Sequence, residues 1–261
     1  MTASPAGWRE YAIEGALLAG FMVSASAFTI LVEHPRGLLS AAITDPLARR
    51  LVTGGAMAIT AAVLVYSKWG ARTGAHMNPA VTLALSRLRP MPRRDVAGYI
   101  GGQFAGGITG MAVAALLFGS SLEHAAVNWA VTRPGPHGAA AAFAAECVMT
   151  LLLMTVVLQL SNHPRWASRA GVATAALLAA FITVEAPLSG MSLNPARTLG
   201  PALFAQDFTA LWIYFIAPPV GMALAAYAYR RQRPDGVCPQ GLHCTHPTHR
   251  THGTHHGKKA L

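Results

Sequence analysis

The sequence contains few charged residues. Aspartate, glutamate, lysine and arginine make up only 11% of the 261 residues, whereas a typical soluble domain carries about 25%. Acidic residues are the scarcest, with 10 Asp and Glu against 20 Lys and Arg, which leaves a net charge of +10. The 3 cysteines give no disulfide framework. These shortages argue against an ordinary soluble domain and against a scaffold held together by disulfides.

Long apolar runs take the place of the missing charges. Hydrophobic residues make up 53% of the chain, and a membrane-spanning helix needs about 20 of them in succession. Six runs reach that length, at residues 11–32, 51–69, 95–118, 139–160, 170–187 and 209–229. Basic residues lie beside these runs and not in a separate basic domain, which indicates membrane topology and a lipid environment, with no nucleic-acid partner. The first run is too long for a signal peptide and contains Glu14.

Two shorter apolar segments interrupt the pattern, at residues 78–87 and 194–204. They are too short to cross a bilayer, and a chain that turns at membrane depth needs protein or a water-filled cavity around it. The order span, span, short segment, span occurs twice, in residues 11–118 and 139–230. Because each copy has three spans, the second copy must be inverted in the membrane. We predict an all-α membrane protein with six transmembrane helices and two half-helices in an inverted repeat.

The distribution of Lys and Arg predicts the orientation. If residues 1–10 are cytoplasmic, most basic residues fall in inner segments, and the outer segments hold only Arg36, Arg49, Arg50, Arg133 and Arg197. The positive-inside rule then places both termini in the cytoplasm, with the protein in the cell (plasma or inner) membrane. The first repeat is longer than the second, and we expect the extra length in residues 33–50, as an external insertion.

Each short segment opens with the tripeptide Asn-Pro-Ala. An asparagine at this position caps the free N–H groups of a helix, and a proline at the first helical position needs no hydrogen-bond partner. One copy would predict only an ordinary helix start. Two copies at corresponding places of an inverted repeat indicate a transport site. The six residues are Asn78, Pro79, Ala80, Asn194, Pro195 and Ala196.

These boxes, within a pattern that runs from about residue 11 to residue 230, resemble those of the aquaporin, or major intrinsic protein, family. The resemblance implies a passive channel that conducts water, with or without small uncharged solutes, and excludes protons and ions. It also implies a homotetramer with one pore per subunit and no cofactor. Two helix N-termini that meet at the bilayer midplane repel cations, and asparagine NH₂ groups can donate to passing water. No pattern of a nucleophile, carboxylate pair or phosphate-binding loop predicts an enzyme.

Further pore positions follow from the resemblance. Arg197 is an ionisable residue at membrane depth, which is functional by default, and the family places it at the narrowest constriction. Spacing from the two asparagines assigns the other filter positions to Ala58, Ile182 and Met191. Ala58 and Ile182 replace the aromatic residue and the histidine that strict water channels usually carry, so we expect a less polar and wider filter, which Met191 can refill.

Support residues can be assigned in the same way. Glu14 and Glu146 are costly in lipid and should face the interior, where the family uses such residues to hold the loops before the half-helices. The extended residues of those loops are expected to present carbonyl groups to the pore: Gly74, Ala75, His76, Gly190, Met191 and Ser192. For His76, a packed loop histidine is an alternative.

Other positions leave the transported solute open. Glycerol facilitators usually carry Asp and Lys where this chain has Thr198 and Ala202, and Tyr214-Phe215 looks like the aromatic pair of water-type members. A water channel and a facilitator for glycerol, urea or metalloid acids such as arsenite therefore both stay as hypotheses.

The last segment, residues 231–261, is polar and is predicted to be disordered. Histidines recur in it every three residues, which puts them on one edge of a polyproline II chain. Such a tract can bind Zn, Ni or Cu, sense pH, or simply be a solvated tail. A membrane protein with a metal-binding regulatory tail is the third hypothesis, with His243, His246, His249, His252 and His255 as candidate ligands and no metal site predicted elsewhere.

Overall fold

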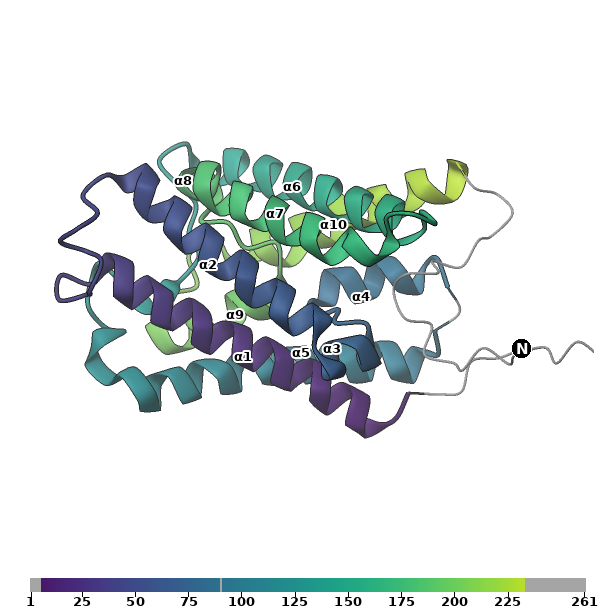
Figure 1. Cartoon of the computed structure of the whole chain (residues 1–261), viewed down its shortest axis with the longest axis horizontal. Coiled ribbons are helices and arrows are strands. Elements are labelled where there is room, and N and C mark those ends of the chain that lie inside the picture. The colour runs from purple at the N-terminus through teal and green to yellow at the C-terminus, as the bar shows by residue number, and fades with distance from the viewer. Residues whose placement is uncertain (1–5, 90, 233–261) are drawn as a thin grey trace, which may run out of the picture.

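The computed structural model describes residues 6–89 and 91–232, and within these ranges all regular structure is helical. Six helices are long and apolar enough to cross a membrane. They are α1 (Trp8–Glu33), α2 (Pro46–Tyr66), α5 (Arg93–Phe118), α6 (Gly138–Ser161), α7 (Ala170–Val184) and α10 (Leu211–Gln232). The predicted all-α membrane architecture is confirmed (Figure 1).

Shorter helices fill the interior and the connections. The segments predicted at 78–87 and 194–204 form α4 (Pro79–Ser86) and α9 (Pro195–Ala205). Two further short helices, α3 (Lys68–Thr73) and α8 (Ala186–Ser189), precede the loops that lead into α4 and α9. Single 3-10 turns, η1 (Gly119–Ser121), η2 (Asn128–Ala130) and η3 (Ala167–Arg169), lie in the connections.

The spans differ from the apolar runs in the sequence by a few residues at their ends, and the physical reason is clear in the second and the fifth. The second begins at Pro46 and not at residue 51, because the Asp45 side chain caps the helix by accepting the Ala48 N–H at 2.7 Å. It ends at Tyr66, where Ser67 closes α2 and caps α3. The fifth run, expected to residue 187, ends as a helix at Val184, and the chain then turns into α8. Hydrophobicity alone does not mark these ends, since apolar residues recur after each of them, at Trp69 and at Ala186.

The two repeats pack in the same way. In the first repeat α1 lies against α5, and in the second α6 lies against α10, while α2 and α7 pack on each other between the repeats. The helices touch backbone to backbone at Gly106 and at Gly221. A Cβ atom on Gly106 would lie 2.1 Å from the Gly15 carbonyl oxygen, and one on Gly221 would lie 2.3 Å from that of Cys147. Small residues at such crossings allow close helix packing in lipid.

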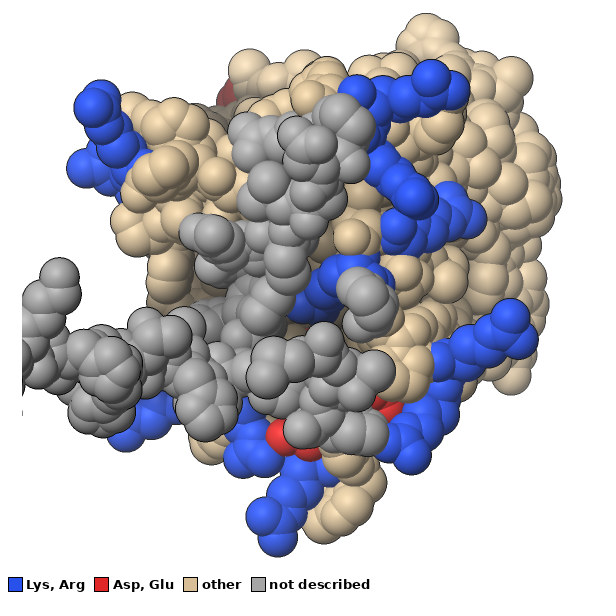
Figure 2. Space-filling model, turned by 90° about the vertical axis from the view of Figure 1, so that its right-hand side faces the viewer, with Lys and Arg blue, Asp and Glu red and all other residues tan. Residues whose placement is uncertain are grey.

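The described ends of the chain lie at the same end of the bundle, which we call the terminal face (Figure 1). Exposed basic side chains surround this face in Figure 2, and the groups that belong to it are Arg9, Lys68, Arg72, Arg87, Arg93, Arg94, Arg165, Arg169, Arg230 and Arg231. The opposite end of the bundle, which we call the loop face, carries residues 34–45, the part of the expected insertion at 33–50 that lies between the helices.

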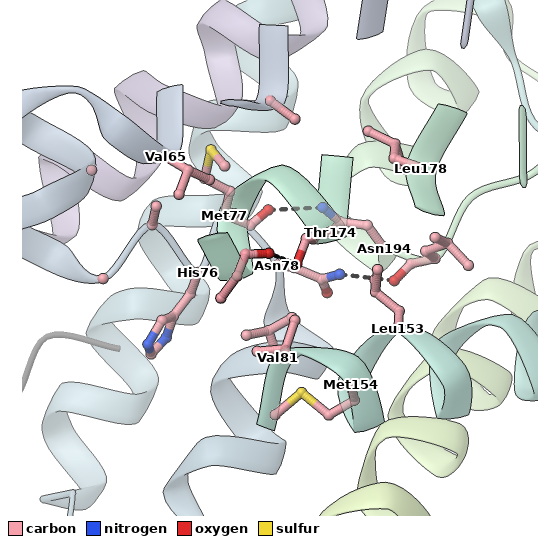
Figure 3. A pocket seen from close by; sticks show the side chains of 18 of the residues that line it. Val65, His76, Met77, Asn78, Val81, Leu153, Met154, Thr174, Leu178 and Asn194 are labelled. Atoms are coloured by element: carbon pink, nitrogen blue, oxygen red, sulfur yellow. Dashed lines mark hydrogen bonds between the residues drawn. The ribbon is translucent and has the colours of Figure 1, made fainter. Parts of the chain in front are cut away.

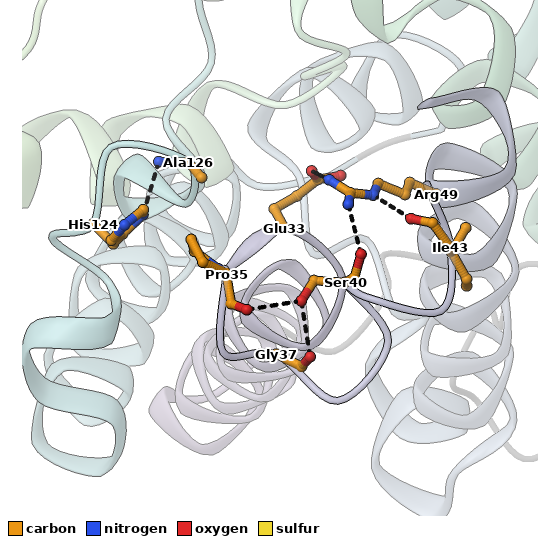
Figure 4. Close-up of polar contacts among 8 residues, drawn as sticks. All are labelled: Glu33, Pro35, Gly37, Ser40, Ile43, Arg49, His124 and Ala126. Atoms are coloured by element: carbon orange, nitrogen blue, oxygen red, sulfur yellow. Dashed lines mark hydrogen bonds and ion pairs between the residues drawn. The ribbon is translucent and has the colours of Figure 1, made fainter. Parts of the chain in front are cut away.

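A single arginine orders the insertion (Figure 4). The Arg49 guanidinium donates to the carbonyl oxygens of Ile43 at 2.7 Å and Ser40 at 2.8 Å, and it forms an ion pair with Glu33 at 3.2 Å. Glu33 ends α1 and Arg49 lies in the first turn of α2, so the guanidinium joins both helix ends to the loop between them. A neighbouring turn is closed by His124, whose Nδ1 accepts the Ala126 N–H at 3.2 Å.

Candidate functional site

The N-termini of α4 and α9 meet inside the bundle, and an asparagine caps each of them. The Oδ1 of Asn78 accepts the Ala80 N–H at 2.9 Å, and the Oδ1 of Asn194 accepts the Ala196 N–H at 3.0 Å. The amide nitrogens cross to the opposite loop. Asn78 Nδ2 donates to the Leu193 carbonyl and Asn194 Nδ2 donates to the Met77 carbonyl, both at 2.8 Å (Figure 3). An amide nitrogen has two N–H groups, so each asparagine keeps one further donor.

The loops before the asparagines share an unusual backbone. Gly74 and Gly190 adopt positive φ angles of 90° and 76° and end the short helices α3 and α8. Farther along, non-glycine residues at matching positions are also left-handed: Ala75 and Met77 in the first loop, Met191 and Leu193 in the second. Each such residue costs about 1–2 kcal/mol, so the loops must be held from outside.

Two buried glutamates hold them. Glu14 accepts the N–H groups of His76 and Met77 at 3.0 and 2.6 Å, and also bonds to Thr73 and Gln103. Glu146 accepts the N–H groups of Ser192 and Leu193 at 2.6 and 2.8 Å, together with the Ser189 hydroxyl. Both side chains are 0% exposed. Each carboxylate thus binds the two N–H groups before the asparagine in its own repeat, an arrangement in which burial of a charge is offset by hydrogen bonds.

His76 has both ring nitrogens occupied. Its Nε2 lies 3.0 Å from an Arg89 Nη2, and its Nδ1 lies 3.1 Å from the Thr82 hydroxyl. Because arginine only donates, Nε2 is the acceptor and Nδ1 carries the proton. His76 therefore joins the first loop to the end of α4, in addition to lining a cavity.

Two cavities lie on either side of the crossed asparagines. The terminal-side cavity has a volume of about 240 Å³ and is lined by Asn78, Asn194, His76, Val81 and Thr174, among others (Figure 3). The loop-side cavity has a volume of about 270 Å³ and is lined by Met57, Ile182, Met191 and further residues. Arg197 and Ser192 line both cavities. The two spaces therefore adjoin at Arg197.

Arg197 is fixed at this junction. Its Nη1 donates to the hydroxyl of the buried Thr132, and its backbone N–H donates to Asn194 Oδ1 at 3.2 Å. Thr132 comes from the connection between the repeats, and nothing in its local sequence indicates this role. The same is true of Gln103, whose amide bonds to Glu14 from α5.

Three of the four candidate filter residues line the loop-side cavity. Ile182, Met191 and Arg197 line the loop-side cavity together. Ala58 lines neither of the two cavities, whereas its neighbour Met57, one helical turn from Thr53, lines the loop-side cavity. Counting back from Asn78 crosses the turn at Ser67 and the separate helix α3, where residue number no longer measures rotation about α2. The spacing of four residues between Thr53, Met57 and Ala61, which all line the cavities, is the signal that could have found Met57.

The predicted carbonyl positions fall at the cavities as well. Gly74, Ala75 and His76 line the terminal-side cavity, Gly190 lines the loop-side cavity, and Ser192 lines both. No group of three or more His, Cys, Asp or Glu side chains in the part of the chain described here could hold a metal. The tail histidines His243, His246, His249, His252 and His255 lie outside the described residues.

Comparison with known proteins decides the family. The model of the major intrinsic protein family matches residues 8–229. The chain belongs to the major intrinsic protein family. Members of this family are passive membrane channels and not enzymes. With six spans in the structure, this protein is a multi-pass membrane protein, and the expectation that it is not an enzyme is confirmed.

Individual relatives come from plants and bacteria. The chain is 37% identical over 213 residues to aquaporin NIP1-4 of Oryza sativa subsp. japonica, covering 80% of this chain and 71% of that protein. It is 38% identical over 183 residues to glycerol uptake facilitator protein-like 6 of Lactiplantibacillus plantarum, covering 69% and 84%. It is 38% identical to aquaporin NIP2-3 of Zea mays, but the matched part spans only 56% of that protein.

A solved structure shows the same fold. The aquaglyceroporin of Plasmodium falciparum superposes with a TM-score of 0.70 at 19% sequence identity, covering 85% of this chain and 96% of that one. At this identity the likeness concerns the fold of the major intrinsic protein family and not the solute.

Proposed function

We propose that this protein is a passive channel that conducts water, with or without small uncharged solutes, and excludes protons and ions. The observation that carries the proposal is the pair of crossed asparagines. Each keeps an amide N–H beside a cavity, and two helix N-termini face each other there with partial positive charge. A water at this point can accept hydrogen bonds from the wall, which interrupts a proton wire, while cations are repelled.

The lining of the loop-side cavity favours a solute facilitator as the second candidate function. Met57, Ile182 and Met191 present apolar surface, and Arg197 supplies hydrogen-bond donors beside it. A small polyol has carbon–hydrogen groups that can contact such a wall and hydroxyl groups that can accept from the guanidinium. A relative named for glycerol uptake supports this choice. In this proposal Met57 takes the filter position that spacing assigned to Ala58.

We also propose an orientation in the membrane and an oligomeric state for the channel. The terminal face carries the basic side chains seen in Figure 2. By the positive-inside rule this face is cytoplasmic, so both termini lie on the cytoplasmic side of the cell membrane. We also propose a homotetramer with one pore in each subunit. The exposure of two helices supports an assembly. In the most apolar 18-residue stretch, only 11% of the residues of α2 and 17% of those of the span that ends with α7 are buried within one subunit.

Stopped-flow light scattering on proteoliposomes tests the function. Osmotic water permeability and the uptake of glycerol, urea and arsenite are measured for the wild-type protein and for Arg197→Ala. Fast water flux with negligible solute uptake supports a water channel. Fast uptake of glycerol, altered by Arg197→Ala, supports the facilitator. Flux no faster than that of protein-free liposomes for every solute contradicts both.

A further inference from the structure

A second arginine lines the loop-side cavity. Arg50, in the first turns of α2, donates from Nε to the Thr183 carbonyl oxygen at 2.9 Å. Thr183 lies at the end of α7, where the carbonyl groups have no partner within the helix and carry partial negative charge. The hydrogen bond therefore joins α2 to α7 and fixes the guanidinium beside the loop-side cavity, which Arg50 lines together with Arg197.

The charge of Arg50 is not neutralised by a carboxylate. In the described part of the chain, the arginines that form ion pairs with carboxylates are Arg49, Arg72, Arg94 and Arg133, and Arg50 is not among them. Glu33 also lines the loop-side cavity, but its carboxylate already forms an ion pair with Arg49. An arginine has five N–H donors, and the bond to Thr183 uses one of them.

Arg197 likewise forms no ion pair with a carboxylate among the described residues. Its guanidinium bonds to the neutral Thr132 hydroxyl. The nearby Glu146 carboxylate attracts it, but the oxygens of Glu146 accept the loop N–H groups of Ser192 and Leu193. The loop-side cavity thus has two guanidinium groups, each with unused donors, on walls that include Phe21, Leu178 and Ile182. Because the charge of Glu33 is already paired with that of Arg49, the lining of the cavity keeps a net positive charge, and its low-dielectric walls strengthen the attraction for anions.

We propose that the loop-side cavity binds a small anion with a carboxylate or tetrahedral oxyanion group, held by Arg50 and Arg197. Guanidinium groups match the geometry of both kinds of anion and bind them through charge-assisted hydrogen bonds. The cavity volume of about 270 Å³ has room for an anion of a few heavy atoms. Because the same cavity leads to Met191 and Arg197, a bound anion closes the path. This site goes beyond the proposed channel function and gives it an inhibitor.

Sulfate is a suitable probe because it stays ionised over the working pH range. Water permeability of proteoliposomes is measured against sulfate concentration at matched osmolarity for wild type, Arg50→Gln, Arg50→Lys and Arg36→Gln. Arg36 is an exposed arginine of the same face and serves as the control for general surface charge. We expect saturable inhibition of wild type and Arg36→Gln. The half-inhibiting concentration should rise at least about tenfold in Arg50→Gln and less in Arg50→Lys.

Two results overturn the site. One is an equal half-inhibiting concentration in wild type and Arg50→Gln. The other is a fall in flux that is linear in sulfate and the same in all four proteins, as a bulk salt effect would give. Titration calorimetry with sulfate on the purified protein in detergent separates the site from the channel. If wild type conducts no water, the channel proposal fails, while saturable heat in wild type and Arg36→Gln that is lost in Arg50→Gln still supports the site. Absence of saturable heat in wild type contradicts it.

Discussion

Asn78 and Asn194 each donate a side-chain N–H to the carbonyl group of the residue just before the other asparagine, at 2.8 Å in both directions. Each amide also caps its own half-helix through Oδ1. The two half-helices are therefore joined by a reciprocal pair of bonds. The remaining N–H group is oriented by two side-chain contacts in Asn78 and by three in Asn194, and not by the rotamer alone.

Replacing the amide by a carboxylate separates capping from donation. Asn194→Asp keeps an oxygen for the Ala196 N–H but turns the donor to the Met77 carbonyl into an acceptor, and it adds a negative charge where the helix dipoles repel cations. We expect proton conductance to rise at least about tenfold, measured with a pH-sensitive dye trapped in liposomes. Asn78→Asp should act in the same direction because its amide makes the same contacts.

Asn128→Asp, which makes the same chemical change in η2, serves as the control and should leave proton conductance unchanged. Proton exclusion that is as tight in both pore variants as in wild type would show that the amide donors do not carry it.

The glutamates that hold the loops should dominate stability. In Glu146→Gln, the new NH₂ group faces the N–H of Ser192 or Leu193, so one bond is lost and two donors oppose each other. Breaking a buried charged network typically costs about 3–5 kcal/mol. We expect a marked fall in the thermal unfolding temperature in detergent, and a similar fall for Glu14→Gln.

The exposed Glu123 provides the comparison, and Glu123→Gln should unfold at the wild-type temperature. If Glu146→Gln and Glu14→Gln unfold together with Glu123→Gln, the left-handed loops are held by something other than the two carboxylates.

Met57 and its neighbour Ala58 test which side of α2 faces the pore. Met57→Phe adds bulk opposite Ile182 and Met191, so we expect glycerol uptake to fall at least about tenfold while water flux falls less. Ala58→Phe adds the same side chain at a position that lines neither cavity, so the ratio of glycerol to water flux should stay at the wild-type value. The reverse result, a changed ratio in Ala58→Phe alone, restores the assignment made by spacing.

The contrast between these two residues shows what the sequence could and could not predict. Features that occur once in each repeat were accessible: the half-helices, their asparagine caps, and Glu14 and Glu146. Repetition distinguishes such features from chance. Met57 lines the loop-side cavity, whereas spacing from Asn78 points to Ala58. The chain turns between α2 and the loop, so residue number alone does not fix the direction of a side chain around α2. Contacts between residues far apart in the sequence, such as Arg197 with Thr132 or Arg50 with Thr183, leave no local sequence pattern.

Glu185 predicts how stability depends on pH. It lies between α7 and α8, just beyond the last residue of the fifth span, and its side chain is 8% exposed. Neither carboxylate oxygen has a hydrogen-bond partner among the described residues. Burial raises the pKa of Glu185 from 4.5 to about 7. The polar groups of Ser189, which lie near the carboxyl group without a hydrogen bond of good geometry to it, offset part of this rise, and the nearby charge of Glu146 adds to it.

A carboxyl group with a raised pKa in the folded state favours folding at low pH, because the folded protein holds the proton more tightly than the unfolded chain. This stabilisation is complete below pH 4.5 and is lost as the pH rises through about 7. Above that pH the penalty is at most about 3 kcal/mol. Glu185→Gln removes the ionisation, so it should unfold at a higher temperature than wild type at about pH 8.5 and at nearly the same temperature at about pH 4.5. The exposed variant Glu123→Gln should show no such difference. If the unfolding temperatures of Glu185→Gln and wild type differ by the same amount at both pH values, the effect comes from packing. The pKa of Glu185 is then not raised by folding.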